Sequence, residues 1–358
     1  MDLTGYSPTR DLARATTIPA AWYTDPRMLE LEKRRVFART WQVVGHAEKV
    51  AECGSYLAAD IAGEPVVVTR AADGELHAFS NVCRHRASLV AKGCGKGSVL
   101  RCPYHGWTYR LDGRLHAAPE FDGVEDWDAL QVCLPRMRAE TWGPLVLVNM
   151  DGEAPALREV MGDIPEQVAG LGCAAEQLHF SARREYVIEC NWKVYVDNYL
   201  EGYHLPAAHP GLFRELDYAQ YRVDTHRWYS SQYAPIRRAR DGEKRQYAEP
   251  LKDNRALYFW IFPNFMLNVY PDNLSSNVIV PLGHDRTLTI FEWFTYGEGS
   301  EVKPETIAFS HEIQQEDIRI CEAVQKGLAS SFYDKGRFSV RRENGVHHFH
   351  LLLDEALR

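Results

Sequence analysis

The feature that most constrains this chain is a pair of short segments that each carry one cysteine and one histidine. Residues 83–85 read C-R-H, and residues 102–105, after sixteen intervening residues, read C-P-Y-H. Thiolates and imidazoles in two closely spaced pairs are typical of a four-ligand metal site. Such a site requires the fold to bring two loops face to face, so it limits what residues 83–105 can form.

Two kinds of metal site match this spacing. A structural zinc ion accepts two cysteines and two histidines, but zinc fingers usually pair cysteine with cysteine and histidine with histidine. Here each loop supplies one of each, which favours a Rieske [2Fe–2S] cluster, where two cysteines hold one iron and two histidines the other. The predicted cluster ligands are Cys83, His85, Cys102 and His105. Structural zinc remains the alternative.

Apolar patterning divides the chain into unlike parts. Residues 46–150 contain short apolar runs separated by turn pairs such as Asp73-Gly74, which predict an all-β domain of hairpins. Residues 1–45 are expected to form a helical segment that packs on the second domain, and residues 151–182 a connecting segment. From residue 183 to residue 358, strand-like runs alternate with longer helices, the last spanning roughly Lys303 to Leu328. The predicted fold class is α+β.

Composition and charge exclude several classes of protein. The chain has 358 residues, 45% of them hydrophobic, and 41 basic against 49 acidic side chains give a net charge of −8. We therefore expect neither a nucleic-acid binder nor a protein of anionic membranes. No apolar run approaches the ~18 residues of a membrane span, and no secretory leader is seen, so a cytoplasmic location is expected.

A second candidate site lies in the other half of the chain. Asn191 is suited to cap a helix that is expected to run through His204 and to stop before Pro206. Glu201 and His204 are three residues apart and would share a face of that helix. Asp197 lies one turn earlier on the same face. It is either an exposed helix residue or a partner that supports the site.

His204 and His209 flank the expected helix stop and need a carboxylate to form the facial triad of a non-haem Fe(II) site. The late helix offers Glu312, Glu316, Asp317 and Glu322. Helical periodicity places Asp317 in the middle of the apolar stripe and the three glutamates toward solvent. A carboxylate on a buried stripe requires a cation or a hydrogen-bond partner, so Asp317 is the predicted third ligand.

Together these motifs resemble the Rieske non-haem iron oxygenases, specifically their terminal oxygenase (α) subunits. The resemblance rests on the C-x-H … C-P-Y-H-G-W loops, the E-G-Y-H-L-P-A-A-H segment at 201–209 and the E-D-I-R-I-C-E-A-V-Q-K-G-L helix at 316–328. It covers nearly the whole chain. It implies an N-terminal all-β Rieske domain followed by a catalytic domain with the helix-grip fold (START/SRPBCC-like) and an antiparallel sheet. It also implies a homotrimer in which the cluster of one subunit serves the iron of its neighbour.

Glu201 carries a further implication of the resemblance. Many members have an aspartate three residues before the first iron-binding histidine, where it bridges the two metal centres. This chain has Glu201 there instead, and in this it is similar to the branch acting on quaternary ammonium compounds such as choline, carnitine and betaines. A carboxylate between two metal-bound imidazoles would fix both tautomers and relay charge.

The resemblance also implies the reaction. A separate reductase or ferredoxin brings electrons that originate in NAD(P)H, the cluster passes them singly, and the mononuclear iron activates O₂ to oxygenate a small organic substrate, with mono-oxygenation favoured over dioxygenation. No glycine-rich dinucleotide fingerprint follows a strand here, which agrees with a separate reductase. Seven basic and one acidic side chain in residues 84–114 favour an acidic redox partner near the cluster loops.

Three alternatives stay open from the sequence. The aromatic side chains of the second half, which would hold a quaternary ammonium cation through their ring faces, also suit an aromatic substrate for ring hydroxylation. A stand-alone Rieske electron carrier would leave the second half unexplained. A zinc-stabilised protein that binds ligands without redox activity would keep the fold and lose the oxygen chemistry.

Overall fold

The computed structural model describes residues 3–172, 174–237, 255–270 and 273–358. The chain forms two compact units. The smaller unit comprises residues 37–155, and the larger comprises residues 1–36 together with residues 156–358. None of the described helices is both long enough and apolar enough to cross a membrane.

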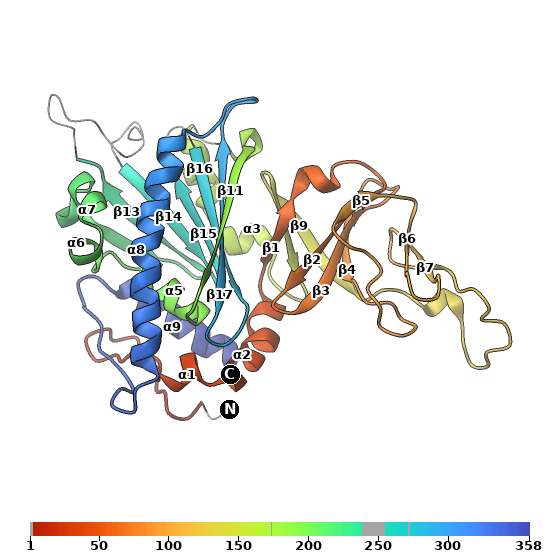
Figure 1. Cartoon of the computed structure of the whole chain (residues 1–358), viewed down its shortest axis with the longest axis horizontal. Coiled ribbons are helices and arrows are strands. Elements are labelled where there is room, and N and C mark those ends of the chain that lie inside the picture. Colours follow the sequence, from red (N-terminus) through yellow and green to blue (C-terminus); the bar gives the residue numbers. More distant parts are fainter. Residues whose placement is uncertain (1–2, 173, 238–254, 271–272) are drawn as a thin grey trace. The chain divides into compact units, whose positions relative to one another are not determined.

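The smaller unit is all-β, as predicted, and contains two antiparallel sheets (Figure 1). In spatial order, the seven strands of the first sheet are β1 (Gln42–His46), β10 (Leu145–Asn149), β9 (Arg136–Trp142), β4 (Leu76–Ser80), β3 (Glu64–Arg70), β2 (Ser55–Ile61) and β5 (Cys94–Lys96). The second sheet has three strands, β6 (Val99–Arg101), β7 (Thr108–Arg110) and β8 (Leu115–Ala117). Short 3₁₀ turns lie at η1 (Phe37–Arg39), η2 (Ala47–Val50) and η3 (Ala129–Gln131).

One glycine explains how the two sheets of this unit pack together. Gly113 lies in the turn between β7 and β8 with a φ of +89°. A Cβ atom there would lie 2.4 Å from the ring of Phe79 on β4. A side chain at this position would therefore be strained in its backbone and would collide with the core. The turn pair Asp112-Gly113 thus fits the second sheet closely against the first.

The larger unit contains a single antiparallel sheet of seven strands. Its spatial order is β11 (His179–Ile188), β17 (Thr287–Thr295), β16 (Asn273–Pro281), β15 (Phe265–Val269), β14 (Arg255–Ile261), β13 (Tyr229–Pro235) and β12 (Arg222–Thr225). Strands β12 to β17 therefore follow one another as a meander, and β11 pairs with the last of them. Because the side-chain period of a strand is two, each strand presents alternate residues to the helices on its two faces.

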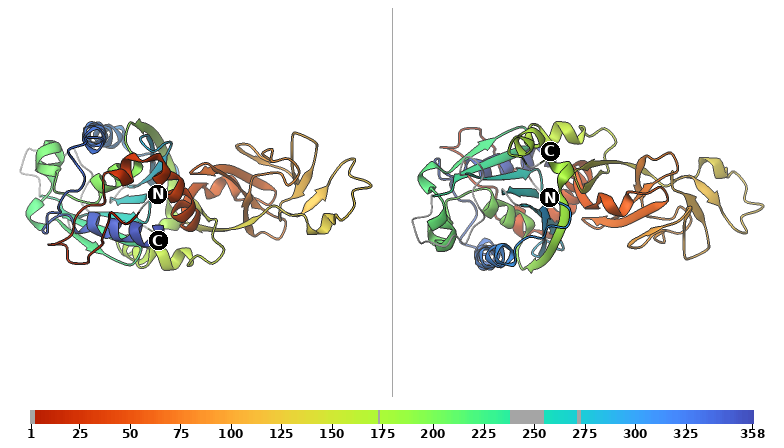
Figure 2. Two further views of the ribbon diagram at one scale, coloured as in Figure 1. Left: turned by 90° about the horizontal axis from the view of Figure 1, so that it is seen from below. Right: turned by 90° about the horizontal axis from the view of Figure 1, so that it is seen from above.

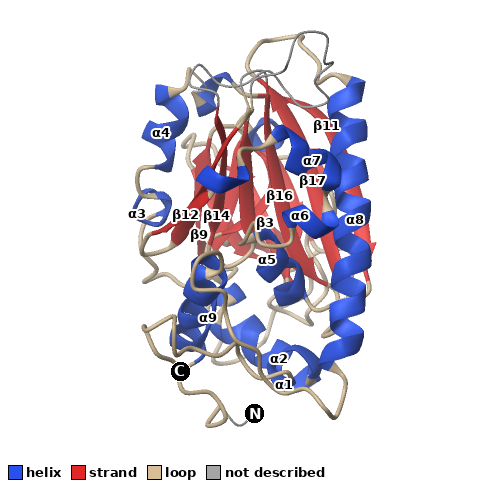
Figure 3. Ribbon diagram, turned by 90° about the vertical axis from the view of Figure 1, so that its left-hand side faces the viewer, coloured by secondary structure: helices blue, strands red, loops and turns tan. Residues whose placement is uncertain are grey.

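The helices of the larger unit are α1 (Ala21–Thr24), α2 (Pro26–Arg35), α3 (Leu157–Met161), α4 (Ile164–Gly170), α5 (Trp192–Tyr199), α6 (Leu205–Ala208), α7 (Pro210–Glu215), α8 (Pro304–Leu328) and α9 (Asn344–Leu357), with 3₁₀ turns η4 (Ala175–Gln177) and η5 (Tyr218–Gln220). The long helix α8 runs beside the strands, with α5, α6 and α7 in front of them (Figure 3). Both views in Figure 2 show α8 end-on, and α9 lies at an angle to it. A long helix held against a curved antiparallel sheet is the helix-grip arrangement, and the predicted α+β class is confirmed.

An enclosed ion pair fixes the N-terminal helices to α5. The Nζ atom of Lys193 lies 2.6 Å from Oε1 of Glu32 on α2, and both side chains are fully buried. The indole of Trp192 donates a second hydrogen bond to the same carboxylate at 2.8 Å. Burial raises the pKa of Glu32 and lowers the pKa of Lys193, and their mutual attraction opposes both shifts. Helix α2 is thereby attached to the helix that leads into residues 201–209.

Two expected boundaries differ from the structure. The helical part of the N-terminal segment ends at Arg35, and Gln42–His46 forms β1, which pairs with β10 in the smaller unit. Asn191 caps α5 as predicted, its side chain accepting a hydrogen bond from the Lys193 N–H, but α5 ends at Tyr199 rather than running to His204. Pro206 stands in the first turn of α6, a position where the missing N–H of proline costs nothing.

Candidate metal centres and active-site cavity

The two cysteine–histidine segments form loops with the same backbone closure. In the first, the N–H of Cys83 donates to Ser88 O and the N–H of Ala87 donates to Cys83 O. In the second, the N–H of Cys102 donates to Trp107 O and the N–H of Gly106 donates to Cys102 O. The fourth residue after each cysteine, Ala87 or Gly106, has a positive φ of 58° or 76°. Matching turns of this kind present one thiol and one imidazole each.

The loops place the two thiols together and the two imidazoles together. Burial raises the pKa of the Cys102 thiol, but hydrogen bonds from the Tyr104 and His105 amides and from Cys83 outweigh this, so its pKa is lowered overall. The sulfur of Cys83 lies 3.2 Å from the hydroxyl of Tyr109. The rings of His85 and His105 lie 4.7 Å apart between centroids. One sulfur pair and one imidazole pair is the division of ligands that a Rieske cluster requires.

One further feature of each imidazole also suits metal binding. The buried Nδ1 atom of His85 has no hydrogen-bond partner among the described residues. Burial, together with the nearby His85 and Arg86, lowers the pKa of His105, which favours its neutral form. The unpaired Nδ1 of His85 is suited to bind a metal, because an orphaned buried polar atom is otherwise costly. These residues therefore fit a [2Fe–2S] cluster.

Aromatic rings pack around the imidazole of His85. The indole of Trp107 stacks on His85, with centroids 5.0 Å apart and planes within 7°. Phe121 meets the same imidazole edge-on at 5.9 Å and also contacts Trp127. The loop that supplies Phe121 and Trp127 lies beyond the cysteine–histidine spacing, so no motif marked it. Trp107 and Phe121 therefore shield part of the His85 imidazole from water.

The second centre is built from the turn that follows α5. Gly202 is followed by Tyr203 and His204, whose N–H groups both donate to Oε2 of Glu201. The other oxygen, Oε1, lies 2.5 Å from Nδ1 of His204. Glu201 and His204 are thus joined through a turn that the carboxylate itself holds, and not through a shared helix face as expected. His204 immediately precedes α6, and its Nε2 is directed toward the carboxylate of Asp317.

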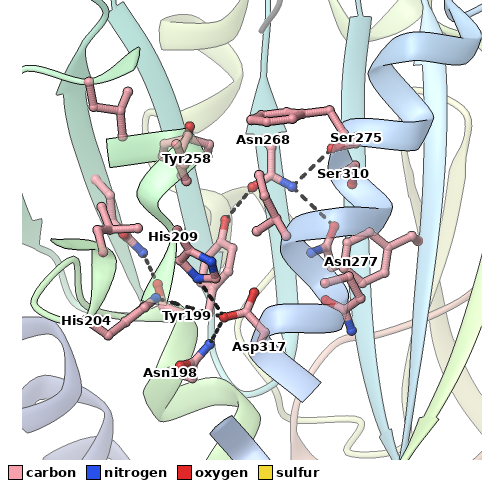
Figure 4. A pocket seen from close by; sticks show the side chains of 18 of the residues that line it. Asn198, Tyr199, His204, His209, Tyr258, Asn268, Ser275, Asn277, Ser310 and Asp317 are labelled. Carbon is pink, nitrogen blue, oxygen red and sulfur yellow. Dashed lines mark hydrogen bonds and ion pairs between the residues drawn. The ribbon is translucent and has the colours of Figure 1, made fainter. Parts of the chain in front are cut away.

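His209 and Asp317 meet His204 in the interior (Figure 4). Nε2 of His209 lies 3.0 Å from Oδ1 of Asp317, and Nε2 of His204 lies 3.9 Å from the same oxygen. One ligand atom from each residue lies within 4.8 Å of the others, so that all three face one point. Two imidazoles and one carboxylate around a point fit an Fe(II) ion with open coordination positions.

Two further side chains hold these three in place. Asn198 on α5 donates its Nδ2 hydrogen bond to Oδ1 of Asp317 at 2.7 Å. Glu316 accepts from Nδ1 of His209 at 2.7 Å. Burial lowers the pKa of His209, but its contacts with Asp317 and Glu316 outweigh this and raise it. Glu316, which periodicity placed toward solvent, is half-buried and orients an imidazole by its distal nitrogen, as carboxylates commonly do at metal sites.

Asp197 does not support His204, although its helical position suggested that it could. It belongs instead to a hydrogen-bond network with Tyr23 and His350. Its carboxylate accepts from the hydroxyl of Tyr23 at 2.5 Å and lies 3.0 Å from Nε2 of His350. The Ile18 N–H donates to Nδ1 of His350, which leaves the proton of that imidazole on Nε2, directed at Asp197. Asp197 has no hydrogen bond to His204 in the described residues. It connects α5 to α9 and to the N-terminal segment.

The iron-binding candidates open into a cavity of about 150 Å³. Its floor is a row of directly opposed residues across the sheet. The pairs are Gln232 with Tyr258, Tyr258 with Asn268, Asn268 with Ser275, and Ser275 with Trp293. Helices α5 and α8 close the cavity with side chains that include Tyr195, Tyr199, Phe309 and Gln314. The register in which these strands pair cannot be read from the sequence, so the sequence does not predict this row of residues.

The cavity lining contains carboxylates but no permanently positive side chain among the described residues. Its lining in the described residues includes the carboxylates of Glu201 and Asp317 and the imidazoles of His204 and His209, but no lysine or arginine. Burial is the largest cause that raises the pKa of the phenols of Tyr195 and Tyr199, which therefore stay neutral. The cavity is thus aromatic, mildly polar and acidic.

Two family profiles divide the chain between them. Residues 40–128 match the Rieske [2Fe–2S] domain, and residues 175–358 match the catalytic domain of the ring-hydroxylating alpha subunit. The second match alone covers half of the chain.

Similar proteins carry both parts. The chloroplastic choline monooxygenase of Arabidopsis thaliana is 36% identical, over 99% of this chain and 86% of its own length. The carnitine monooxygenase oxygenase subunit of Escherichia coli strain K12 is 34% identical, over 96% and 94% respectively. A solved quaternary ammonium Rieske monooxygenase superposes with a TM-score of 0.85 at 30% identity and 97% coverage of both chains.

The contact between Glu316 and His209 predicts a measurable effect on metal affinity. Glu316→Ala removes the acceptor that orients His209, so we expect about 10- to 100-fold weaker binding of Fe(II) at the mononuclear site, with the visible spectrum of the cluster unchanged. Glu312→Ala is the matched control, because Glu312 lies one turn earlier on α8 and is exposed. Equal Fe(II) affinities in the two variants would show that Glu316 has no such role.

Proposed function

This chain belongs to the Rieske non-haem iron oxygenases, and from that premise we propose that it is a terminal oxygenase for a small quaternary ammonium compound. It is an oxidoreductase whose cofactors are a Rieske [2Fe–2S] cluster and a mononuclear iron. In the proposal, the substrate is hydroxylated at a carbon beside the nitrogen or demethylated. Mono-oxygenation is favoured, as in the relatives that share most of this chain.

The residues have distinct roles in this proposal. Cys83 and Cys102 hold one cluster iron, His85 and His105 hold the other, and His204, His209 and Asp317 hold the mononuclear iron. When bound, the cluster supplies single electrons and the mononuclear iron supplies the oxygen-activating centre. Glu201 contacts Nδ1 of His204 and Glu316 contacts Nδ1 of His209, so both histidines direct Nε2 toward Asp317, where the metal would bind.

The aromatic and acidic lining of the cavity is the observation that supports a quaternary ammonium substrate. Eight aromatic side chains line the cavity, namely Tyr195, Tyr199, Tyr221, Tyr258, Tyr270, Phe291, Trp293 and Phe309, and the acidic groups there are Glu201 and Asp317. A quaternary ammonium ion cannot donate hydrogen bonds, so it is held best by ring faces, at about 0.5–2 kcal/mol for each ring. Nearby carboxylates favour a cation further.

Electron delivery requires partners in this proposal. A separate reductase or ferredoxin reduces the cluster. The seven basic side chains between residues 84 and 114 are all exposed, which would favour an acidic partner. The acidic loop at 120–128 offsets part of this charge, because its residue Phe121 packs against His85 and Trp127 packs against Phe121. A homotrimer is proposed from the family resemblance, and inter-subunit electron transfer is described for the solved relative.

Oxygen uptake by the loaded enzyme, supplied with a reductase, tests the proposed substrate class. We expect choline, betaines or carnitine to stimulate uptake and to be converted in proportion to the O₂ consumed, because their cation matches the aromatic and acidic walls. Benzoate serves as the comparison, because ring hydroxylation would use the same aromatic cavity. If benzoate couples O₂ uptake to its own oxidation and none of the quaternary ammonium compounds does, the chain is a ring-hydroxylating oxygenase instead.

Glu201 is proposed to link the cluster of one subunit to the iron of the next, as the resemblance implies. Glu201→Gln removes the negative charge while retaining an oxygen to accept from the backbone N–H groups of the turn. We expect both metal centres to be retained and cluster oxidation in a single turnover to slow by about 10- to 100-fold. Cluster oxidation at the wild-type rate, measured by stopped-flow absorbance, would exclude a linking role.

A further inference from the structure

Three polar side chains form a cluster in the otherwise aromatic part of the cavity floor. Asn268 lies on β15, and Ser275 and Asn277 lie on the same face of the neighbouring strand β16 because they are two residues apart. All three are buried, with 8%, 5% and 3% of their surfaces exposed, and all three line the cavity. Figure 4 shows the cluster set apart from His204, His209 and Asp317.

The side-chain amide of Asn268 forms all of its hydrogen bonds with other protein groups. Its Oδ1 accepts from the hydroxyl of Tyr199 at 3.0 Å. Its Nδ2 donates to Oγ of Ser275 at 3.1 Å and to Oδ1 of Asn277 at 3.2 Å. An amide has two donor hydrogens, and both are engaged. Asn268 therefore braces the two β16 side chains and has no donor left for a ligand.

Ser275 and Asn277 each keep an unused donor. The two hydrogen bonds from Asn268 go to the acceptor oxygens of these side chains, so the hydroxyl hydrogen of Ser275 and the Nδ2 amine of Asn277 are not engaged by them. In the described part of the chain, neither group donates a hydrogen bond. Buried donors without acceptors are costly, and in a cavity they are normally satisfied by a ligand or by water. The two donors lie on one strand face and are directed into one cavity.

The two donors of Ser275 and Asn277 limit which atom of a ligand can bind to them. Two donors require an acceptor, and in a simple quaternary ammonium compound this is an oxygen, because the nitrogen has no lone pair. A carboxylate would need a nearby cation to offset its desolvation, whereas the described lining has no lysine or arginine and holds the carboxylates of Glu201 and Asp317. A hydroxyl oxygen carries no such cost, because it is uncharged and its two lone pairs can accept from both donors.

We infer that Ser275 and Asn277 bind an uncharged hydroxyl oxygen of the substrate, and that among quaternary ammonium compounds this enzyme therefore prefers an amino alcohol to a carboxylate. The inference rests on the proposed function, because it assigns the second end of the same substrate. The aromatic walls hold the cation, and the donor pair holds the oxygen. With both ends fixed, the orientation of the substrate toward His204, His209 and Asp317 is fixed as well.

Binding to the loaded enzyme under anaerobic conditions tests this with three ligands. Choline carries the cation and the hydroxyl, ethyltrimethylammonium lacks the hydroxyl, and glycine betaine carries a carboxylate. We expect the dissociation constant of choline to be about tenfold lower than that of ethyltrimethylammonium, since one buried neutral hydrogen-bonded group is lost. Betaine should bind more weakly than choline. This comparison uses the unaltered protein, so it does not depend on the folding of a variant.

Variants of Ser275 and Asn277 then test whether these two side chains bind the hydroxyl oxygen of choline. Ser275→Ala and Asn277→Leu should each reduce the preference for choline over ethyltrimethylammonium toward one. Ser276→Ala is the matched control, because Ser276 is the next residue of β16, is equally buried and lies on the opposite face. The control should keep the tenfold preference.

Each contrary result has a distinct meaning. Equal affinities for choline and ethyltrimethylammonium in the wild type would overturn the inference and leave the proposed substrate class intact. Tighter binding of betaine than of choline would overturn the preference for an uncharged oxygen. A preference that survives in both Ser275→Ala and Asn277→Leu would place the oxygen elsewhere. Failure of all three quaternary ammonium compounds to bind would overturn the proposed function together with this inference.

Discussion

The carboxylate of Asp317 accepts an amide hydrogen bond from Asn198 at 2.7 Å, lies 3.0 Å from the imidazole of His209 and is largely enclosed. A negative charge in such a place is tolerated only with a cation or with several donors. Three separate elements therefore converge on it: α8 carries the carboxylate, α5 carries the amide, and the turns around α6 carry the histidines. The cavity opens beside this point, so the position of the substrate follows from the same convergence.

Each imidazole around Asp317 is oriented by a second carboxylate. Glu201 and Glu316 take the Nδ1 positions of His204 and His209, which leaves both Nε2 atoms toward Asp317. The arrangement places three carboxylates around two imidazoles, an excess of negative charge that a divalent cation would offset. The same excess gives the cavity its acidic character, which links metal binding to the proposed preference for a cationic substrate.

The sequence predicts those parts of the site that depend on short-range patterns, namely ligand spacing, helix capping and helical periodicity. The cysteine–histidine spacing indicated a Rieske cluster, Asn191 was recognised as a helix cap, and helical periodicity placed Asp317 on the interior face of α8. The helix-grip domain came from the family resemblance. The end of α5 was misjudged because Glu201 forms side-chain bonds to the following backbone N–H groups, and these replace a further helical turn.

The remaining features depend on tertiary contacts that no short pattern encodes. Glu316 lies well away from the centre of the apolar stripe, yet its side chain reaches His209 because the segment after α6 lies against that side of α8. The donor pair of Ser275 and Asn277 is visible only once the register of β15 with β16 is known. Phe121 reaches His85, and Trp127 packs against Phe121, from a loop that no motif marks.

The most direct test of the account is the metal content of Asp317→Ala compared with that of the wild type. The account predicts about three irons and two acid-labile sulfides per wild-type chain, and about two of each in the variant, with the cluster spectrum unchanged and oxygenation lost. A variant that keeps the third iron and its oxygenase activity would contradict the assignment of Asp317 as the carboxylate ligand.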